Sequence, residues 1–269
     1  MKTYTVEEIK KSLSECGIKQ GDTILMHSSL YQLGLLDSCS TKDLCENIFQ
    51  IITKYLGAEG TLLVPAFFYE YARCKLAFDV KLSPVSKSLG VFPQYIVTRS
   101  DCVRSLNPTT CLAGIGKNAN YICNGKSAKA FGINSPWHKL HTCGGKIISF
   151  GGKETDMLTF LHHVEHMFGV PHMYHKYYTV PIFNNGEKIN LPVSSFVRYL
   201  DYNIEHDHNK FVSQAHQEGI IKHCSLGMSN VFCCLCEDLF DLGIKCLEED
   251  TFYFLAQRPS FLQSEYPLI

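Results

Sequence analysis

The chain has 269 residues, of which 45% are hydrophobic and 19% charged, and its formal net charge is −1. This length suffices to bury a large core, and the near-zero charge gives no overall field that would attract nucleic acid or an anionic membrane. No segment approaches the roughly 20 apolar residues of a membrane span, and no apolar stretch follows the N-terminus as in a signal peptide. Without a linker or repeat to divide it, we expect a single cytoplasmic domain over residues 1–269.

The first half of the chain alternates helices and short apolar strands. Thr5–Cys16 has apolar residues at helical spacing, and Thr5 can cap its start. Thr23–His27 is a short apolar run typical of a buried strand, Thr41–Tyr55 is a second helix, and Thr61–Pro65 a second buried strand. Strand, helix and strand with short connections predict an α/β fold with a parallel or mixed sheet covered by helices.

The middle of the chain is less regular. Phe67–Ser88 has no clear period and predicts a long, partly ordered loop, whereas Gly90–Thr98 predicts a helix. Lys146–Phe150 is another apolar run bounded by glycines, and Thr159–Phe168 predicts a helix that ends at Gly169 and Pro171.

A hairpin and a helical extension are expected after this. Tyr177–Phe183 and Lys188–Val193 alternate around Asn184-Asn185-Gly186, a strong turn signal. We expect the remaining part, residues 195–269, to be helical, with Met228–Leu242 as one apolar helix.

The thirteen cysteines predict reduced thiols, because the chain is large, the count is odd and no export signal is present. Cys233-Cys234-Leu235-Cys236 raises a zinc hypothesis but has no second Cys pair or spaced His pair nearby. Buried, inert thiols are the preferred interpretation.

Asp156–His166 carries the most informative chemistry. On a helix, His162 and Glu165 share a face, and a carboxylate beside an imidazole fixes its tautomer and stabilises its protonated form. The segment follows a strand, where open α/β sheets place their ligands. The pair alone is also compatible with an ordinary surface contact.

The same residues permit a different mechanism. His162-x-x-Glu165-His166 matches the inverted zincin signature, in which two histidines bind zinc and the glutamate acts as a base. No other peptidase feature surrounds it, so zinc proteolysis ranks second and we expect no metal.

Five further blocks resemble, in order, those of the aminoglycoside 3-N-acetyltransferase family. They are Gly21–Gly34, Gly60–Phe67, Val103–Thr110, Ser135–Trp137 with Gly145–Gly151, and Asp156–Glu165. The similarity extends over roughly residues 1–180 and fades beyond them.

This resemblance implies a three-layer α/β/α enzyme with a central mixed sheet, often dimeric, that transfers an acetyl group directly from acetyl-CoA to an amine. The family's catalytic histidine and glutamate correspond to His162 and Glu165. A neutral imidazole is a suitable base for an ammonium group that must lose its proton before it attacks a thioester. Backbone N–H groups or the hydroxyls of Thr109 and Thr110 would stabilise the thioester oxygen.

The resemblance also implies contacts with the cofactor. The loop residues His27, Ser28, Ser29 and Leu30 would bind the pantetheine arm. Lys87 and Ser88, in a turn before a helix, and then Arg104 are the candidates for the phosphates.

Two departures and the local charge bear on the acceptor. Asn107 and Thr110 stand where the family usually carries histidines, while His and Lys outnumber Asp and Glu beside the catalytic helix. We therefore expect a nucleotide-linked amino sugar for surface polysaccharide as the acceptor, with an aminoglycoside as the alternative. Asp156 and Phe67 are the expected acceptor contacts.

Two interpretations remain for other features. A non-catalytic acyl-CoA or sugar-binding module would keep the loop blocks without needing the His162–Glu165 pair. His206-Asp207-His208 is either a metal ligand set or a solvated loop, and the loop is preferred.

Overall fold

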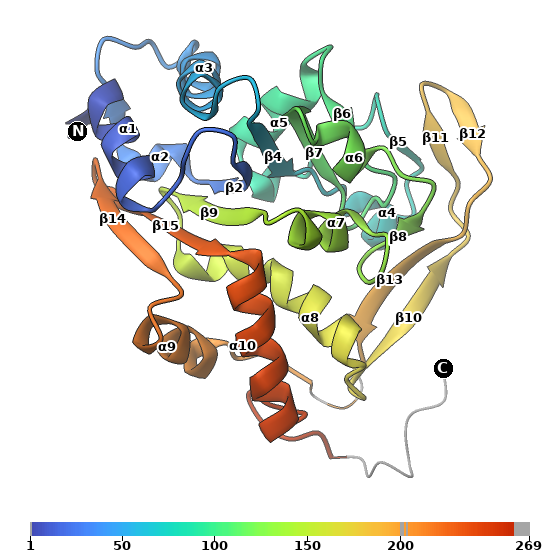
Figure 1. Ribbon diagram of the computed structural model, residues 1–269. Helices are drawn as coiled ribbons and strands as arrows, with labels where there is room; N and C mark the ends of the chain where they lie inside the picture. The colour runs from blue at the N-terminus through green and yellow to red at the C-terminus, as the bar shows by residue number, and fades with distance from the viewer. Residues whose placement is uncertain (1, 200–201, 203, 261–269) are drawn as a thin grey trace.

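The computed structural model describes residues 2–199, 202 and 204–260. Its centre is a seven-stranded mixed sheet (Figure 1). In spatial order the strands are β14 (Lys222–Leu226), β15 (Ser229–Leu235), β9 (Lys146–Phe150), β2 (Thr23–Ser28), β4 (Thr61–Pro65), β7 (Leu112–Gly116) and β6 (Val103–Arg104). β2 runs parallel to β4 and β9, and the other neighbouring pairs are antiparallel.

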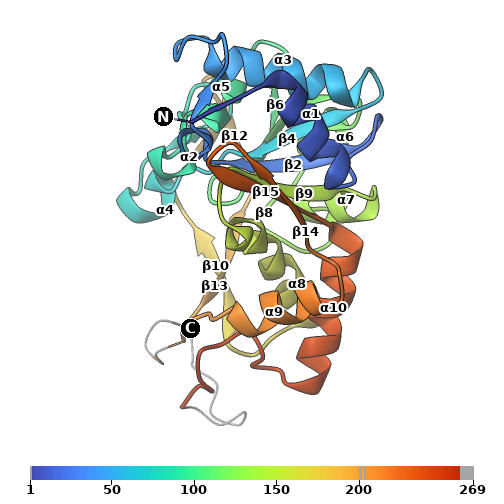
Figure 2. The same cartoon turned by 90° about the vertical axis from the view of Figure 1, so that its left-hand side faces the viewer.

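Helices cover both faces of this sheet, because its central strands are apolar on both sides. Ile24 and Met26 of β2 pack with α1 (Val6–Glu15), α3 (Leu44–Leu56) and α5 (Val91–Thr98). Leu25 packs in a second cluster with α6 (Ala119–Cys123), α7 (Pro136–Thr142), α8 (Leu161–Phe168), α9 (Asn209–Gln217) and α10 (Cys236–Glu249). The two helical layers appear above and below the sheet in Figure 2. The expected three-layer α/β/α class is therefore confirmed.

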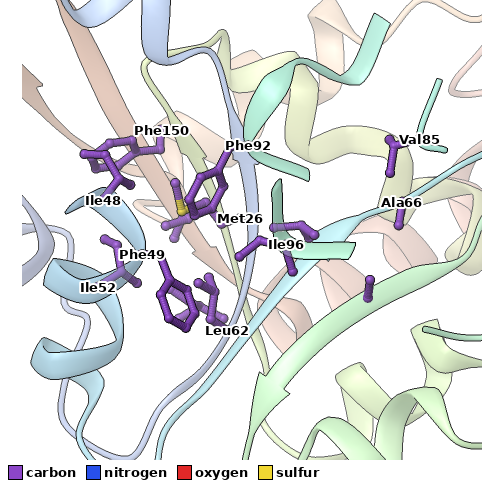
Figure 3. Packing of buried hydrophobic residues seen from close by; sticks show 14 of the residues in the cluster. Met26, Ile48, Phe49, Ile52, Leu62, Ala66, Val85, Phe92, Ile96 and Phe150 are labelled. Carbon is purple, nitrogen blue, oxygen red and sulfur yellow. The ribbon is translucent and has the colours of Figure 1, made fainter. Parts of the chain in front are cut away.

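The first of these clusters interlocks helix and strand side chains. Ile48 and Ile52 of α3 are fully buried, and Phe49 reaches toward Leu62 of β4 (Figure 3). At the start of α1, Thr5 accepts a hydrogen bond from the N–H of Glu8 while the Glu8 carboxylate accepts one from the N–H of Thr5. This capping box explains why the helix begins where the sequence predicted.

Smaller elements surround the sheet. They are β1 (Thr3–Tyr4), α2 (Leu30–Leu33), β3 (Leu35–Leu36), α4 (Glu70–Cys74), β5 (Phe78–Asp79), the 3-10 helix η1 (Lys87–Leu89), β8 (Ala128–Lys129), the 3-10 helix η2 (Glu154–Phe160), β10 (Met173–Tyr178), β11 (Ile182–Asn184), β12 (Glu187–Ile189) and β13 (Val193–Arg198). The segment predicted as a loop over Phe67–Ser88 thus contains α4 and β5.

The expected hairpin is confirmed and is longer than predicted. Its tip pairs Ile182 with Ile189, and β10 pairs with β13 in the same register from Tyr178–Val193 to Met173–Arg198. A break at residues 179–181 and 190–192 divides the two ladders. The lower part of the hairpin, β10 and β13, lies beside α8, whereas its tip, β11 and β12, projects away from that helix (Figure 1).

The prediction that the C-terminal part is helical is wrong for the end of β13, for β14 and for β15. Ser229–Leu235 is a strand of the central sheet, and a helix begins only at Cys236. A short apolar run is equally compatible with a strand and with a buried helix. Here the segment is a strand because it forms backbone hydrogen bonds with its antiparallel partner β9. Residues 200, 201, 203 and 261–269 of that predicted helical part lie outside the described residues.

The cysteine cluster is buried. Burial raises the pKa of Cys233 to about 12 and that of Cys236 well above its ordinary value. Both are therefore inert, protonated thiols at neutral pH, as the sequence suggested. In the part of the chain that the structure describes, no helix is both long and apolar enough to cross a bilayer.

Candidate active site

Three parallel strands end at one edge of the sheet and define the first pocket. β2, β4 and β9 lead into the loops that begin at Ser29, Ala66 and Gly151, which is where α/β sheets bind ligands. A cavity of about 290 Å³, here called the Ser29 pocket, lies at these strand ends. It is lined by His27, Ser28, Ser29, Pro65, Phe67, Tyr69, Ser88, Leu89, Thr155, Asp156 and Thr159.

Two buried polar atoms in the Ser29 pocket have no partner among the described residues. They are Nε2 of His27 and Oγ of Ser28. Burial lowers the pKa of His27 to about 4, so its imidazole is neutral at pH 7. Buried polar groups normally have partners. A ligand with amide groups, as in a pantetheine arm, would supply them, so the residues present fit the expected cofactor.

A second cavity of about 310 Å³, the Thr110 pocket, shares Phe67, Tyr69 and Thr159 with the first. Thr109 and Thr110 also line it, and both are organised by Asn107. The Asn107 side-chain oxygen accepts hydrogen bonds from the N–H and hydroxyl groups of both threonines, and its amide donates to Ala128 and Ser194 carbonyls. Asn107, one of the two departures from the family pattern, thus holds this loop in place.

The predicted catalytic pair lies at the far side of the Thr110 pocket, on α8. Nδ1 of His162 is 2.8 Å from Oε2 of Glu165, one turn away on the same face. Glu165 is fully buried, whereas the His162 side chain is 31% exposed and opens on the pocket.

Two histidines that the sequence analysis missed complete this group. His172 Nε2 and His206 Nε2 lie 3.1 Å and 2.9 Å from Oε1 of Glu165. Burial alone would raise the pKa of Glu165, but the hydrogen bonds from His162, His172 and His206 hold it well below its ordinary value. The interpretation of residues 206–208 as a solvated loop is therefore wrong for His206, which is brought to Glu165 by a segment 41 residues away in sequence.

This arrangement fixes the tautomer of the neutral His162 ring. An ionised carboxylate only accepts hydrogen bonds, so Nδ1 of His162 must carry the hydrogen and donate it to Glu165. Nε2 is then left with a lone pair on the pocket side and can take a proton from a ligand. The group is a positioned base with a charge-stabilising carboxylate behind it.

A third cavity of about 590 Å³, the His206 pocket, continues from the Thr110 pocket and shares His162, Arg73, Tyr178, Phe196 and Val197 with it. Met173, Tyr174, Lys176, Arg198 and His206 complete its lining. The β10–β13 wall therefore closes the side of the site opposite the strand ends. None of these wall residues was predicted.

The inverted zincin interpretation is wrong for this geometry. His166 does not face Glu165 but packs against the rings of His175 and Phe196. Its ring also fills the space at Gly132, where a Cβ would lie 2.2 Å from it. The metal-compatible group among the described residues is instead His162, Glu165 and His206, and both oxygens of its carboxylate accept hydrogen bonds from histidines.

Several other predicted site residues are placed differently. Arg104 is 5% exposed, and its guanidinium donates to the carbonyls of Ala66, Ser83 and Pro84, so the prediction that it binds phosphate is wrong. The Leu30 side chain packs in the core, which leaves only its backbone for a ligand.

Asp156 lines the Ser29 pocket and neither of the two pockets that contain His162. Its carboxylate accepts a hydrogen bond from the Lys153 N–H. The structure therefore does not place Asp156 beside an acceptor at His162. Phe67 lies between the first two pockets. Ser88 lines the Ser29 pocket, and the adjacent Lys87 is exposed.

Curated proteins with a similar sequence are N-acetyltransferases. Aminoglycoside N(3)-acetyltransferase IX of Micromonospora chalcea is 24% identical over 69% of this chain and 70% of its own. Aminoglycoside N(3)-acetyltransferase III of Pseudomonas aeruginosa is 22% identical over 91% of this chain and 94% of its own.

Solved structures share the fold. AAC-IIIb in a binary complex with CoASH matches with a TM-score of 0.76 at 22% identity, over 96% of this chain and 100% of that one. AAC-VIa bound to sisomicin matches with a TM-score of 0.77 at 20% identity, over 92% and 98%. The sequence profile of one family matches residues 25–248, which extends well beyond the resemblance first noted over residues 1–180. The chain belongs to the aminoglycoside 3-N-acetyltransferase family.

Proposed function

We propose that this chain transfers the acetyl group of acetyl-CoA to a primary amine of an amino sugar, with His162 as the base. The single observation that carries the proposal is the His162–Glu165 pair, whose free Nε2 opens on a chain of three connected pockets. A binding module without catalysis would not need this oriented base.

The Ser29 pocket is the proposed site of acetyl-CoA. His27, Ser28 and the loop backbone would pair with the pantetheine amides, and Lys87 would lie near the phosphates. The thioester would then reach the Thr110 pocket. There the Thr110 hydroxyl, whose two partners both lie 3.3 Å away, is freer than that of Thr109 to donate to the thioester oxygen.

The acceptor amine would enter from the His206 pocket. His162 Nε2 takes one proton from the amine as its nitrogen attacks the thioester carbon. The C–S bond breaks as the C–N bond forms, and the proton passes to the leaving thiolate to give CoASH. Glu165 stabilises the transient imidazolium and does not itself take a proton from the acceptor.

The names of the relatives put aminoglycosides first among the acceptors to be tested. They give no support to a nucleotide-linked amino sugar for polysaccharide synthesis, which the sequence analysis favoured. The test is release of free CoASH from acetyl-CoA with a panel that includes sisomicin, gentamicin and simple amino sugars. Absence of amine-dependent release with every acceptor would refute the proposal.

A further inference from the structure

Three cationic side chains converge on the wall of the His206 pocket. Arg73 comes from α4, Lys176 from β10 and Arg198 from β13. No Asp or Glu among the described residues lines this pocket. The wall that faces the base is therefore positively charged, although the whole chain has a net charge of −1.

None of these cations forms an ion pair in the part of the protein that the structure describes, although the charge of Arg73 interacts favourably with the carboxylate of Glu70. Arg73 lies over the Tyr69 ring at 4.7 Å and Lys176 near the Tyr178 ring at 5.7 Å, and no ion pair there involves either residue or Arg198. Glu70, one turn before Arg73, accepts a hydrogen bond from Ser86, which lowers the pKa of Glu70. By contrast, Arg99 and Lys146, outside the pocket, each pair with a carboxylate.

The carboxylate nearest the base forms no ion pair with the cations of this wall. Glu165 is fully buried behind His162 and His206, and its oxygens are occupied by histidines. A polycationic ligand would meet repulsion from the wall, whereas an anionic group would gain charge-assisted hydrogen bonds from three donors. Tyr174, Tyr178 and Phe196 add aromatic surface to the lining of the same pocket.

We infer that the His206 pocket selects an acceptor that carries a phosphate or another anionic group on its amino sugar. The amine lies at Nε2 of His162 and the anionic group at Arg73, Lys176 and Arg198. This inference rests on the proposed acetyl transfer and names the charge of its acceptor.

The test uses two amino sugars that differ only in a phosphate, glucosamine and glucosamine 6-phosphate, with sisomicin as the polycation. We expect kcat/KM for CoASH release to be at least about tenfold higher with the phosphorylated sugar than with glucosamine. Equal values for the two sugars, or a preference for sisomicin, would overturn the inference while leaving acetyl transfer established.

Pocket variants identify where the phosphate binds. Arg198→Gln and Lys176→Gln should each raise KM for glucosamine 6-phosphate by about tenfold and leave KM for acetyl-CoA unchanged. Lys188→Gln, which removes an exposed charge at the tip of the same hairpin, is the matched control and should change neither. A rise in KM for acetyl-CoA alone would assign the cations to the cofactor phosphates and overturn the inference.

A binding measurement separates the two proposals if no acceptor is turned over. Glucosamine 6-phosphate and glucosamine are titrated calorimetrically into the protein saturated with CoASH. Binding of the phosphorylated sugar alone, lost in Arg198→Gln, would support the charge of the pocket although the proposed reaction had failed. Equal binding of both sugars, or of neither, would overturn the inference.

Discussion

The Ser29 pocket and the His206 pocket are built in opposite ways. The first is built mainly from the ends of β2 and β4 and from residues that follow β2, β4 and β9 in sequence, with Ser88 and Leu89 of η1 added. The second collects single side chains from α4, from both strands of a hairpin and from the loop at His206. The sheet fixes the positions of the loops at its strand ends. A surface made of side chains from separate elements can change its charge by single substitutions. In this chain the proposed donor site is therefore positioned mainly by the sheet, and the proposed acceptor site is assembled from separate side chains.

His162 lines the His206 pocket and the Thr110 pocket that separates it from the Ser29 pocket, and its loss should have the largest effect. We expect His162→Asn to lower kcat by about two to four decades, because the amine loses its base, while KM for acetyl-CoA stays nearly unchanged. The measurement is steady-state CoASH release. The exposed His223, replaced by Gln, serves as control. Near-normal turnover in His162→Asn would remove this residue from the mechanism.

His27 and His163 are buried as neutral side chains, so a lower pH should reduce the free energy of unfolding. Burial lowers the pKa of His27 to about 4 and, together with neighbouring histidines, that of His163 to about 3. Both values lie below the unfolded value of about 6.5, so the unfolded chain binds more protons and stability falls as pH drops from about 7 toward 4.

Each of these two groups should cost about 2 kcal/mol of unfolding free energy at pH 5. Urea unfolding at pH 7.5 and pH 5.0 measures the loss. In His163→Phe, the difference in unfolding free energy between the two pH values should be smaller by about 2 kcal/mol. An unfolding free energy that does not change between the two pH values would contradict the buried neutral state of both side chains.

Glu165→Gln should reduce kcat less, by about one to two decades. The Gln carbonyl oxygen can still accept from Nδ1 of His162, and its amide can turn to His172 and His206, which then use their other tautomer. The charge that stabilises the imidazolium is lost. A fall as large as that of His162→Asn would show that the carboxylate charge, and not orientation, dominates.

Arg104→Lys should have the smallest effect and should act on the fold alone. One ammonium group cannot serve three carbonyls that the guanidinium now reaches, so we expect a loss of about 1 to 2 kcal/mol in unfolding free energy. KM for acetyl-CoA should not change. An increase in that KM with unaltered stability would restore the phosphate-binding role.

The elements around the Ser29 pocket could be predicted because local patterns determine them. The apolar runs at Thr23–His27 and Lys146–Phe150, and the cap at Thr5, are signals within a few residues. The strand Ser229–Leu235 could not be distinguished from a helix, because its apolar run continues into α10 and only pairing with β9 decides. The hydrophobic pattern of a segment does not show which strand it will pair with.

The His206 pocket could not be predicted for a related reason. The hairpin turn at Asn185-Gly186 was recognisable, and alternation puts Tyr174, Lys176 and Tyr178 on one face. Nothing local shows that this face is turned toward His162. His172, four residues beyond the end of the catalytic helix at Phe168, was the nearest available signal, since a buried histidine beside a catalytic carboxylate needs a partner.

The position of the cysteines gives the molecule a natural attachment point. All thirteen lie within the described residues, and Cys74 is the one whose side chain is classed as exposed. It directly follows Arg73, a residue of the His206 pocket, at the end of α4. A maleimide fluorophore should therefore couple first at this thiol and report, by a change in its emission, when the neighbouring wall is occupied. The same thiol is the one to block before any colorimetric count of released CoASH, because it would otherwise add to the background.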